Sequence, residues 1–236
     1  MAMLRLSEQS NPQRDNTASY MAVRTRFFDD LVLQSTRDGI RQVVILATGM
    51  DTRAFRLDLP AETDWYELDQ SEVLELKEEI LNSENAIPRC RRIVLPVDLK
   101  QGWRSEVARA GLGLTKPSMW IVEGLLYYLD QQEVAELLGQ ISSCAAAGSV
   151  LGADLVSASF FESPWTKKAL EMMAARGLAW RFGTDDPELL FTEHGWHAQV
   201  TQPGEEGANY GRWSFPVPLR TQRELPHSFL VKATRT

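Results

Sequence analysis

The residues most able to do chemistry in this chain lie where short apolar runs end. The stretch Val43–Arg53 reads V-V-I-L-A-T-G-M-D-T-R, so a run of β-branched and aliphatic residues ends in Gly49. About 20 residues later, Asp69 closes the acid-rich run W-Y-E-L-D. This spacing is typical of a strand, a glycine turn, a helix and a second strand. In such a unit the turn lets a ligand approach the backbone, and the acid can bind a ribose.

The glycine turn lacks the G-x-G-x-x-G pattern of dinucleotide sites. A dinucleotide needs those extra glycines because its pyrophosphate packs closely against a helix N-terminus. A ligand that carries a ribose but no phosphate does not need them. S-adenosylmethionine (SAM) is the common molecule of that description, so we expect SAM as the cofactor.

Two further acids follow the next strands that we expect, Asp98 with Leu99 and Glu123 in front of a glycine. In an open α/β sheet, ligands bind outside the carboxyl ends of the strands. Carboxylates gathered there repel one another, and a ligand with ribose hydroxyls, an exocyclic amine and an ammonium would supply compensating donors. Other interpretations stay open: Asp69 and Asp98 could cap the following helices, and Glu123 could be a solvent-facing loop acid.

Arginines near the expected site could bind the carboxylate of a methionine moiety. Arg24 and Arg26 lie on a predicted helix over residues 18–34, and either could reach over the site in a bidentate fork, although a surface arginine is the default. Asp51 and Arg53 could pair with each other or support the glycine loop.

Candidates for a general base are few. Tyr127 and His194 are the weak candidates for a catalytic base. No G-x-S-x-G elbow supports Ser/His/Asp catalysis. His194 and His197 straddle a break between predicted elements, and the two cysteines lack metal-ligand spacing, so we expect no metal.

Several large apolar residues follow the expected sheet core. They could line an apolar substrate pocket, but their spacing favours a helical core. These residues are Trp165, Met172, Met173, Trp180 and Phe182.

The alternation of β-like and helical patterns through Leu155 predicts a parallel sheet with right-handed crossovers. Asp130 with Glu133 resembles a capping box at the start of a helix. The last two strands suit a terminal antiparallel hairpin, and 202–226 between them is rich in Pro and Gly and therefore irregular. Strands are expected at 42–48, 64–69, 92–97, 119–122, 149–155, 196–201 and 228–234, and helices at 18–34, 71–82, 103–110, from 130, 163–176 and 187–194.

Composition bounds the partners and the compartment. With 236 residues and 44% hydrophobic content, the chain can bury one substantial core. A net charge of −7 argues against a nucleic-acid partner. No apolar run reaches membrane-spanning length, the N-terminus lacks a signal-peptide core, and two cysteines give no disulfide framework. We therefore expect a cytoplasmic protein with no membrane partner, whose oligomeric state stays open.

These motifs together resemble the leucine carboxyl methyltransferase family. V-V-I-L-A-T-G-M-D-T-R, Y-E-L-D-Q, P-V-D-L and W-I-V-E-G-L-L-Y-Y-L are most similar to its bacterial branch of SAM-dependent O-methyltransferases, which includes polyketide-tailoring enzymes. The resemblance spans about Tyr20 to Leu155. It departs at Ala47, because the family usually reads L-G-A-G where this chain reads L-A-T-G. By this resemblance, the SAM-binding residues are Arg24, Gly49, Asp69, Asp98, Leu99 and Glu123.

The resemblance implies a class I methyltransferase fold: a doubly wound, mostly parallel Rossmann-like sheet with a C-terminal antiparallel strand and a small helical cap. We expect a single domain over 1–236. Its parts are an N-terminal cap helix (about 1–40), a SAM-binding core (41–155), a substrate cap (156–195) and terminal strands (196–236).

The function expected is methyl transfer from SAM to an oxygen of a small-molecule, secondary-metabolite acceptor. A carboxylate is favoured over a hydroxyl because no convincing base is present. The alternatives are a catalytically weak SAM-binding protein and a nucleotide-dependent oxidoreductase on the same fold.

Overall fold

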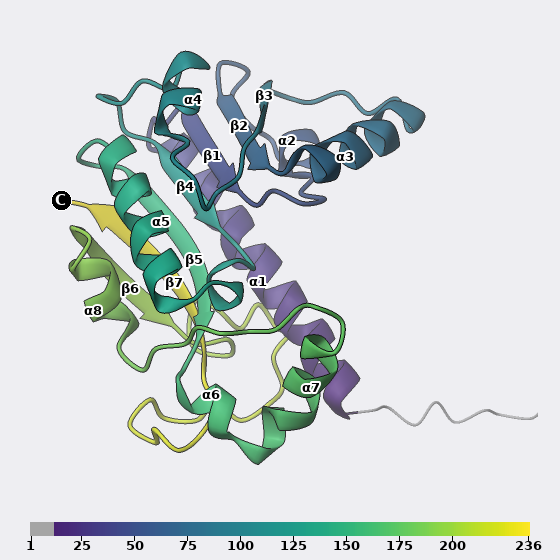
Figure 1. Cartoon of the computed structure of the whole chain (residues 1–236), viewed down its shortest axis with the longest axis vertical. Helices are drawn as coiled ribbons and strands as arrows, with labels where there is room; N and C mark the ends of the chain where they lie inside the picture. The colour runs from purple at the N-terminus through teal and green to yellow at the C-terminus, as the bar shows by residue number, and fades with distance from the viewer. Residues whose placement is uncertain (1–11) are drawn as a thin grey trace, which may run out of the picture.

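The computed structural model describes residues 12–236, which form one mixed sheet covered by helices (Figure 1). The seven strands run in the order β3-β2-β1-β4-β5-β7-β6. Strands β1 to β5 are parallel, and β7 is antiparallel to both of its neighbours, β5 and β6. The predicted parallel sheet with an antiparallel C-terminal strand is confirmed. The strands are β1 Gln42–Leu46, β2 Asp64–Asp69, β3 Arg91–Pro96, β4 Met119–Val122, β5 Val150–Val156, β6 Trp196–Thr201 and β7 Ser228–Arg235.

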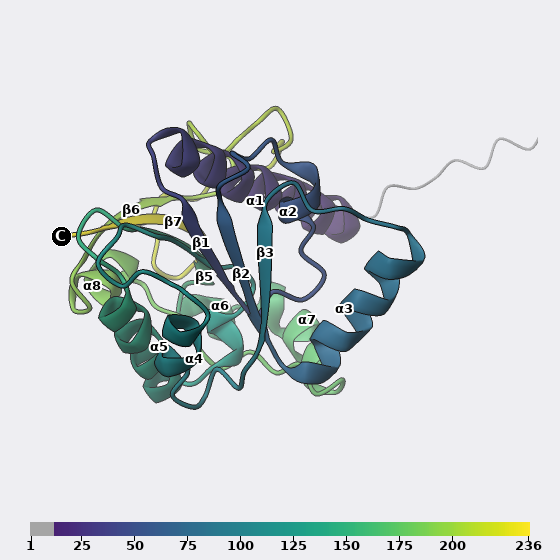
Figure 2. The same ribbon diagram turned by 90° about the horizontal axis from the view of Figure 1, so that it is seen from above.

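Helices cover both faces of this sheet. Viewed from above, α1 and α2 lie on one face, and α4 and α5 lie on the other (Figure 2). In residues 12–236 no helix is both long enough and apolar enough to cross a membrane. The helices are α1 Pro12–Arg37, α2 Arg53–Arg56, α3 Ser71–Ser83, α4 Arg104–Arg109, the 3-10 helix η1 Leu126–Tyr128, α5 Gln131–Cys144, α6 Ser159–Glu162, α7 Pro164–Ala174 and α8 Pro187–Thr192.

Most element boundaries agree with the predicted ones to within a few residues, and the exceptions have local causes. The first helix is longer than the predicted 18–34, and the cap expected over about 1–40 starts outside the described residues. Strand β1 ends before Ala47, whose φ of 51° lies outside the extended region. The short elements α2, η1 and α6 were not predicted, because a single turn is too short to show a helical period.

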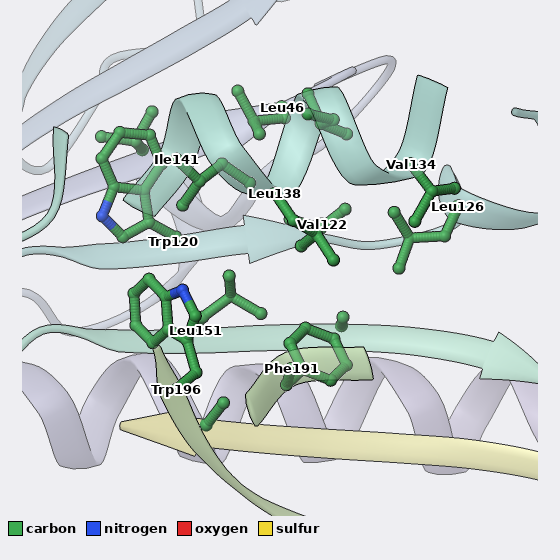
Figure 3. Packing of buried hydrophobic residues seen from close by; sticks show 14 of the residues in the cluster. Leu46, Trp120, Val122, Leu126, Val134, Leu138, Ile141, Leu151, Phe191 and Trp196 are labelled. Carbon is green, nitrogen blue, oxygen red and sulfur yellow. The ribbon is translucent and has the colours of Figure 1, made fainter. Parts of the chain in front are cut away.

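Helix α5 follows its sequence signals closely. The carboxylate of Asp130 accepts a hydrogen bond from the Glu133 N–H, and the Glu133 side chain accepts one from the Asp130 N–H. The predicted capping box is confirmed. The apolar stripe of the helix packs on the sheet beside Trp120 and Val122, and α8 contributes Phe191 to the same core (Figure 3). The buried stripe consists of Val134, Leu137, Leu138 and Ile141.

Helix α1 packs directly on the backbone of β5. A Cβ atom on Gly152 would lie 2.7 Å from Leu31 and 3.0 Å from Phe28, both of which are on α1. Gly152 therefore permits a close approach that any side chain would prevent. On the same face, Val43 and Ile45 of β1 belong to the apolar cluster that α1 covers. This contact brings the N-terminal half of α1 to the carboxyl ends of the strands.

Helix α7 differs from the prediction in its environment. It has no buried residue, and Trp165 and Met172 are 76% and 51% exposed. The expectation that they form a helical core is therefore wrong, because α7 turns this apolar face to solvent. Farther along, Trp180 stacks on Tyr127 with ring centroids 4.1 Å apart, and Phe182 is buried in the main core.

Candidate functional site

The glycine turn after β1 and the acid ending β2 are in direct contact. The Gly49 N–H donates to Asp69 Oδ2 over 2.8 Å, and the Gln70 N–H donates to Asp69 Oδ1 over 2.8 Å. Gly49 has φ +47°, a backbone conformation that glycine adopts without strain. The N-cap position of α3 is Gln70, with no side-chain capping bond. The carboxylate of Asp69 thus joins the glycine turn rather than the first turn of α3.

Asp98 organises the exposed loop after β3. Its Oδ1 accepts from the Lys100 N–H over 3.0 Å, and its Oδ2 accepts from Gln101 Nε2 over 3.1 Å. Helix α4 starts later, with Trp103 at its N-cap position. The neighbouring Leu99 lines a cavity of about 150 Å³, whose other lining residues are Lys100, Leu125, Leu129, Glu133, Glu136 and Leu137.

Of the two candidate arginines, the structure brings Arg24 to the strand ends. Arg24 Nε lies 2.9 Å from Glu123 Oε1, and its Nη1 donates to Asp154 Oδ2 over 3.0 Å and to the Tyr127 hydroxyl over 3.1 Å. Arg26 instead lies on the outer side of α1, where its side chain is 63% exposed. It forms an ion pair with Asp30, one helical turn along. Arg24 and Glu123, both expected to bind SAM, form an ion pair with each other.

A second arginine shares Glu123. Arg53 Nη1 lies 2.8 Å from Glu123 Oε2, and Arg53 Nε donates to Asp29 Oδ1 over 2.8 Å. Arg53 also pairs with Asp51, in agreement with one of the two interpretations left open for these residues. Glu123 therefore bridges two guanidinium groups, and this network joins α1, α2 and the end of β4.

Burial controls the ionisation of this network. The pKa of Glu123 is raised because burial disfavours its charge, although Arg53 and Arg24 act in the opposite direction. Burial works against the charge of Arg24, but Asp154, Tyr20, Tyr127 and Glu123 together outweigh it, and the pKa of Arg24 is raised. Burial and Asp154 also raise the pKa of Tyr127 far above its ordinary value, so this phenol stays protonated.

Four residues of this network line the main cavity, which has a volume of about 470 Å³: Arg24, Asp51, Arg53 and Glu123. Arg24 Nε is buried there without a hydrogen-bond partner, although it lies within ion-pair distance of Glu123. The methionine end of SAM carries a carboxylate and an ammonium, which are complementary to a guanidinium beside a carboxylate. The residues present therefore fit this group. The lining residues are Met21, Arg24, Thr25, Ile45, Ala47, Thr48, Met50, Asp51, Thr52, Arg53, Arg56, Ile121 and Glu123.

His194 lies at the opposite end of the sheet. Its carbonyl oxygen accepts from Arg235 Nη1, and the Arg235 N–H donates to the Ser149 carbonyl just before β5 begins. The structure therefore does not bring His194 to the carboxyl ends of the strands, whereas Tyr127 lies beside Arg24. Among residues 12–236, no group of three or more His, Cys, Asp or Glu side chains could hold a metal ion.

Sequence reasoning missed Asp154, which lies inside β5 and is fully buried. Asp154 Oδ1 accepts from the Gly124 N–H over 2.6 Å, and its Oδ2 accepts from the Tyr20 hydroxyl over 2.9 Å and from Arg24. A signal was present, because a lone acid within a buried apolar strand needs partners.

Glu67, two residues before Asp69, is also fully buried. Its Oε2 accepts from Lys77 Nζ over 2.8 Å and from Arg92 Nη2 over 2.7 Å. Lys77 Nζ also lies 3.2 Å from the Thr48 hydroxyl, so these buried charges contact the glycine loop directly.

Comparison with known proteins identifies the family. The leucine carboxyl methyltransferase family model matches residues 2–142. The chain belongs to the leucine carboxyl methyltransferase family. A Streptomyces avermitilis protein, provisionally named an S-adenosyl-L-methionine-dependent methyltransferase, is 38% identical over 97% of this chain and 79% of its own length. A protein of Mycobacterium avium with the same provisional name is 37% identical over 94% of this chain and 75% of its own length.

Solved structures agree on the fold. A protein of the DUF574 family from Streptomyces avermitilis has a TM-score of 0.68 at 17% identity, covering 95% of this chain and 90% of that protein. The magnesium protoporphyrin IX methyltransferase of Synechocystis, solved with S-adenosylhomocysteine (SAH), has a TM-score of 0.56 at 15% identity, covering 97% and 89%. The fold is that of class I methyltransferases. With the family assignment, this chain is a SAM-dependent methyltransferase with SAM as its cofactor, and the comparisons favour this over the oxidoreductase alternative.

Proposed function

We propose that this member of the family transfers the methyl group of SAM to an oxygen atom of a small-molecule acceptor, and that the acceptor oxygen belongs to a carboxylate. The main support is the set of titratable residues in the main cavity. Among the described residues that line it, these are Arg24, Asp51, Arg53, Arg56 and Glu123.

None of these residues is suited to remove a proton from a hydroxyl. Both carboxylates are held by guanidinium groups, Asp51 by Arg53 and Glu123 by Arg24 and Arg53. The Tyr127 phenol has a strongly raised pKa. A hydroxyl acceptor benefits from a general base, whereas a carboxylate is already ionised at neutral pH. A site of this kind is therefore better suited to a carboxylate acceptor.

We further propose which residues hold the cofactor. Arg24 and Glu123 would bind the methionine carboxylate and ammonium, Gly49 and Asp69 the ribose, and Asp98 with Leu99 the adenine. When bound, SAM supplies a methyl group already activated by its sulfonium, so the protein mainly orients the two reactants and excludes water.

The domain division also remains a proposal, with a single domain in which residues 41–155 bind SAM. Helices α1, α6 and α7 would form the cap over the acceptor. Helix α8 instead packs against the edge strand β6.

For the acceptor, a small molecule of secondary metabolism suits the family resemblance, and the net charge of −7 disfavours nucleic acid.

A labelling assay with SAM carrying a tritiated methyl group tests the proposal. Candidate acceptors are pairs of carboxylic acids and alcohols or phenols with the same carbon skeleton. A methyl ester is hydrolysed by mild alkali and releases volatile labelled methanol, whereas a methyl ether retains its label. We expect alkali-labile label, formed by the wild-type protein and by Arg26→Lys and lost in Arg24→Lys.

Label that resists alkali would overturn the carboxylate assignment. SAM binding without transfer to any acceptor would favour the second candidate, a SAM-binding protein with weak or no catalysis. One observation favours that candidate: Ala47, which lines the cavity, has a left-handed backbone conformation with φ 51°.

A further inference from the structure

Asp154 connects three parts of the molecule from inside the sheet. It is fully buried in β5, on the face that α1 covers. Its two oxygens accept from the Tyr20 hydroxyl and Arg24 on α1 and from the Gly124 N–H just after β4. All three donors bind one carboxylate that has no contact with solvent. The carboxylate therefore fixes the positions of the three donors relative to one another.

Arg24 lies between two carboxylates that differ in their access to a ligand. Glu123 lines the main cavity and is shared with Arg53, so a ligand ammonium can compete for it. Asp154 does not line the cavity. When Glu123 turns to a ligand ammonium, Asp154 is the anion that remains with Arg24.

We propose that Asp154 is a positioning residue that holds the Arg24 guanidinium directed at the carboxylate of the ligand's amino-acid end. Because Asp154 stays paired with Arg24, Glu123 can exchange its contact with Arg24 for a contact with the ligand ammonium. This inference rests on the proposed role of Arg24 in SAM binding.

Asp154→Asn keeps the shape of the side chain and removes its charge. If the amide oxygen keeps the Gly124 bond, the amide nitrogen faces Arg24, a donor opposite a donor. Glu123 is then the principal anion left to Arg24, and the Arg24–Glu123 pair tightens. A ligand zwitterion must break that tighter pair, so binding of the amino-acid end is weakened while the adenosine end is unaffected.

The experiment compares two ligands that share an adenosine end. SAH carries the amino-acid end, and 5′-methylthioadenosine lacks both its carboxylate and its ammonium. Dissociation constants for both are measured by titration calorimetry on the wild-type protein, Asp154→Asn, Arg24→Lys and Ser149→Ala. Ser149 is the matched control: it is a buried polar residue next to β5 at the other end of the strand, where its hydroxyl accepts from the Ser118 N–H.

We expect the wild-type protein to prefer SAH by roughly tenfold or more, the range for hydrogen bonds to charged groups. Asp154→Asn should lose most of this preference, as Arg24→Lys does, with binding of 5′-methylthioadenosine changed less than threefold. Ser149→Ala should keep the preference even if its melting temperature falls.

The outcomes separate this inference from the proposed site. If the wild-type protein does not prefer SAH, the Arg24 assignment fails, and the role of Asp154 fails with it. If Arg24→Lys loses the preference but Asp154→Asn keeps it, only the role of Asp154 is overturned. Equal weakening of both ligands in Asp154→Asn also overturns it, because the residue is then structural.

Should Asp154→Asn not fold, Asp154→Glu keeps the charge but displaces the carboxylate, and it should also lose the preference. If neither variant folds, Asp154 is a stability residue and the inference is wrong.

Discussion

The two faces of the sheet serve different purposes, although both are covered by helices and both are buried. On the α5 face, Trp120 and Val122 of β4 pack against an apolar helical stripe. On the α1 face, Ile121 begins a similar apolar contact, but the next residue on that face is Glu123, in a network of arginines and carboxylates. One strand thus contributes to an apolar core on one side and to an ion network on the other.

The difference is energetic as well as chemical. Apolar burial contributes stability in proportion to the area removed from water. Buried ion pairs contribute little net stability, because the cost of removing charges from water offsets their attraction. Their value here is a fixed pattern of charge beside a cavity. Substitutions in the apolar contact of α5 should therefore change folding, and substitutions in the ion network of the α1 face should change ligand binding.

The largest expected effect is on the α5 face. Leu138 is fully buried, and Leu138→Ala should lower the free energy of unfolding by about 2–5 kcal/mol, because it removes apolar contacts and leaves a cavity. Urea unfolding measures this loss. Below the melting temperature, the affinity for SAH should stay within about twofold of wild type. A large loss of affinity would show that the two faces are coupled.

The next largest effect is on the α1 face and concerns binding. Arg24→Lys keeps the charge but loses the planar fork, so SAH binding should weaken by about 1.5–3 kcal/mol. Arg26→Lys is the control, because Arg26 is exposed and two positions away on the same helix. Calorimetric titration of both variants tests the contrast. Loss of binding in Arg26→Lys alone would mean that the wrong arginine was assigned.

The sequence predicted the α5 face more completely than the α1 face. The capping box of Asp130 and Glu133 and the stripe of α5 were visible because helical periodicity and capping are local patterns. The acids at strand ends were also found, since their positions follow from strand boundaries. Arg24 emerged from the family resemblance, because helical spacing alone does not distinguish a surface arginine from a buried one.

What sequence reasoning missed depends on contacts between distant residues. Asp154 is 130 residues from Arg24, and no local pattern indicates that the two meet. The sharing of Glu123 by Arg24 and Arg53 depends on how α1 and α2 pack over β4. The exposure of Trp165 was also missed, because an amphipathic period shows that a helix has an apolar face but not whether another element covers it.

A smaller effect is expected from pH, with opposite signs for folding and binding. Burial raises the pKa of Glu123 above its ordinary value of 4.5. The folded protein then holds this proton more tightly than the unfolded chain. The contribution of Glu123 to stability is therefore present below pH 4.5 and is lost as pH rises through the folded-state pKa. A ligand ammonium favours the ionised carboxylate, so SAH affinity should rise over the same window.

Titrations of stability and of SAH affinity between acidic and neutral pH measure both slopes. Glu123→Gln removes the ionisable group, so the part of each slope that is due to Glu123 should disappear. If SAH affinity has the same pH dependence in Glu123→Gln as in the wild-type protein, the ammonium does not bind to Glu123.

The smallest expected effect concerns the loop between the two faces. Ala47 has φ 51° and Gly49 has φ +47°, so two residues of one turn share a left-handed conformation, which costs an alanine about 1–2 kcal/mol and a glycine nothing. Ala47→Gly relieves this cost in the folded protein. It also gives the unfolded chain more conformational entropy, which lowers stability by about 0.5–1 kcal/mol. Stability should therefore change by less than about 1 kcal/mol. Removal of the Ala47 methyl from the cavity should tighten SAH binding by a few fold.

Gly49→Ala is the opposite change in the same turn. A Cβ at Gly49 would meet no atom within 4 Å, so its effect is backbone strain alone. It should destabilise the protein by about 1 kcal/mol. Thermal unfolding and SAH titration of both variants separate strain from contact. If Ala47→Gly leaves the affinity unchanged while Gly49→Ala lowers stability as expected, the Ala47 methyl is harmless. The departure from the family's glycine pattern would then not be a reason to expect a weak SAM site.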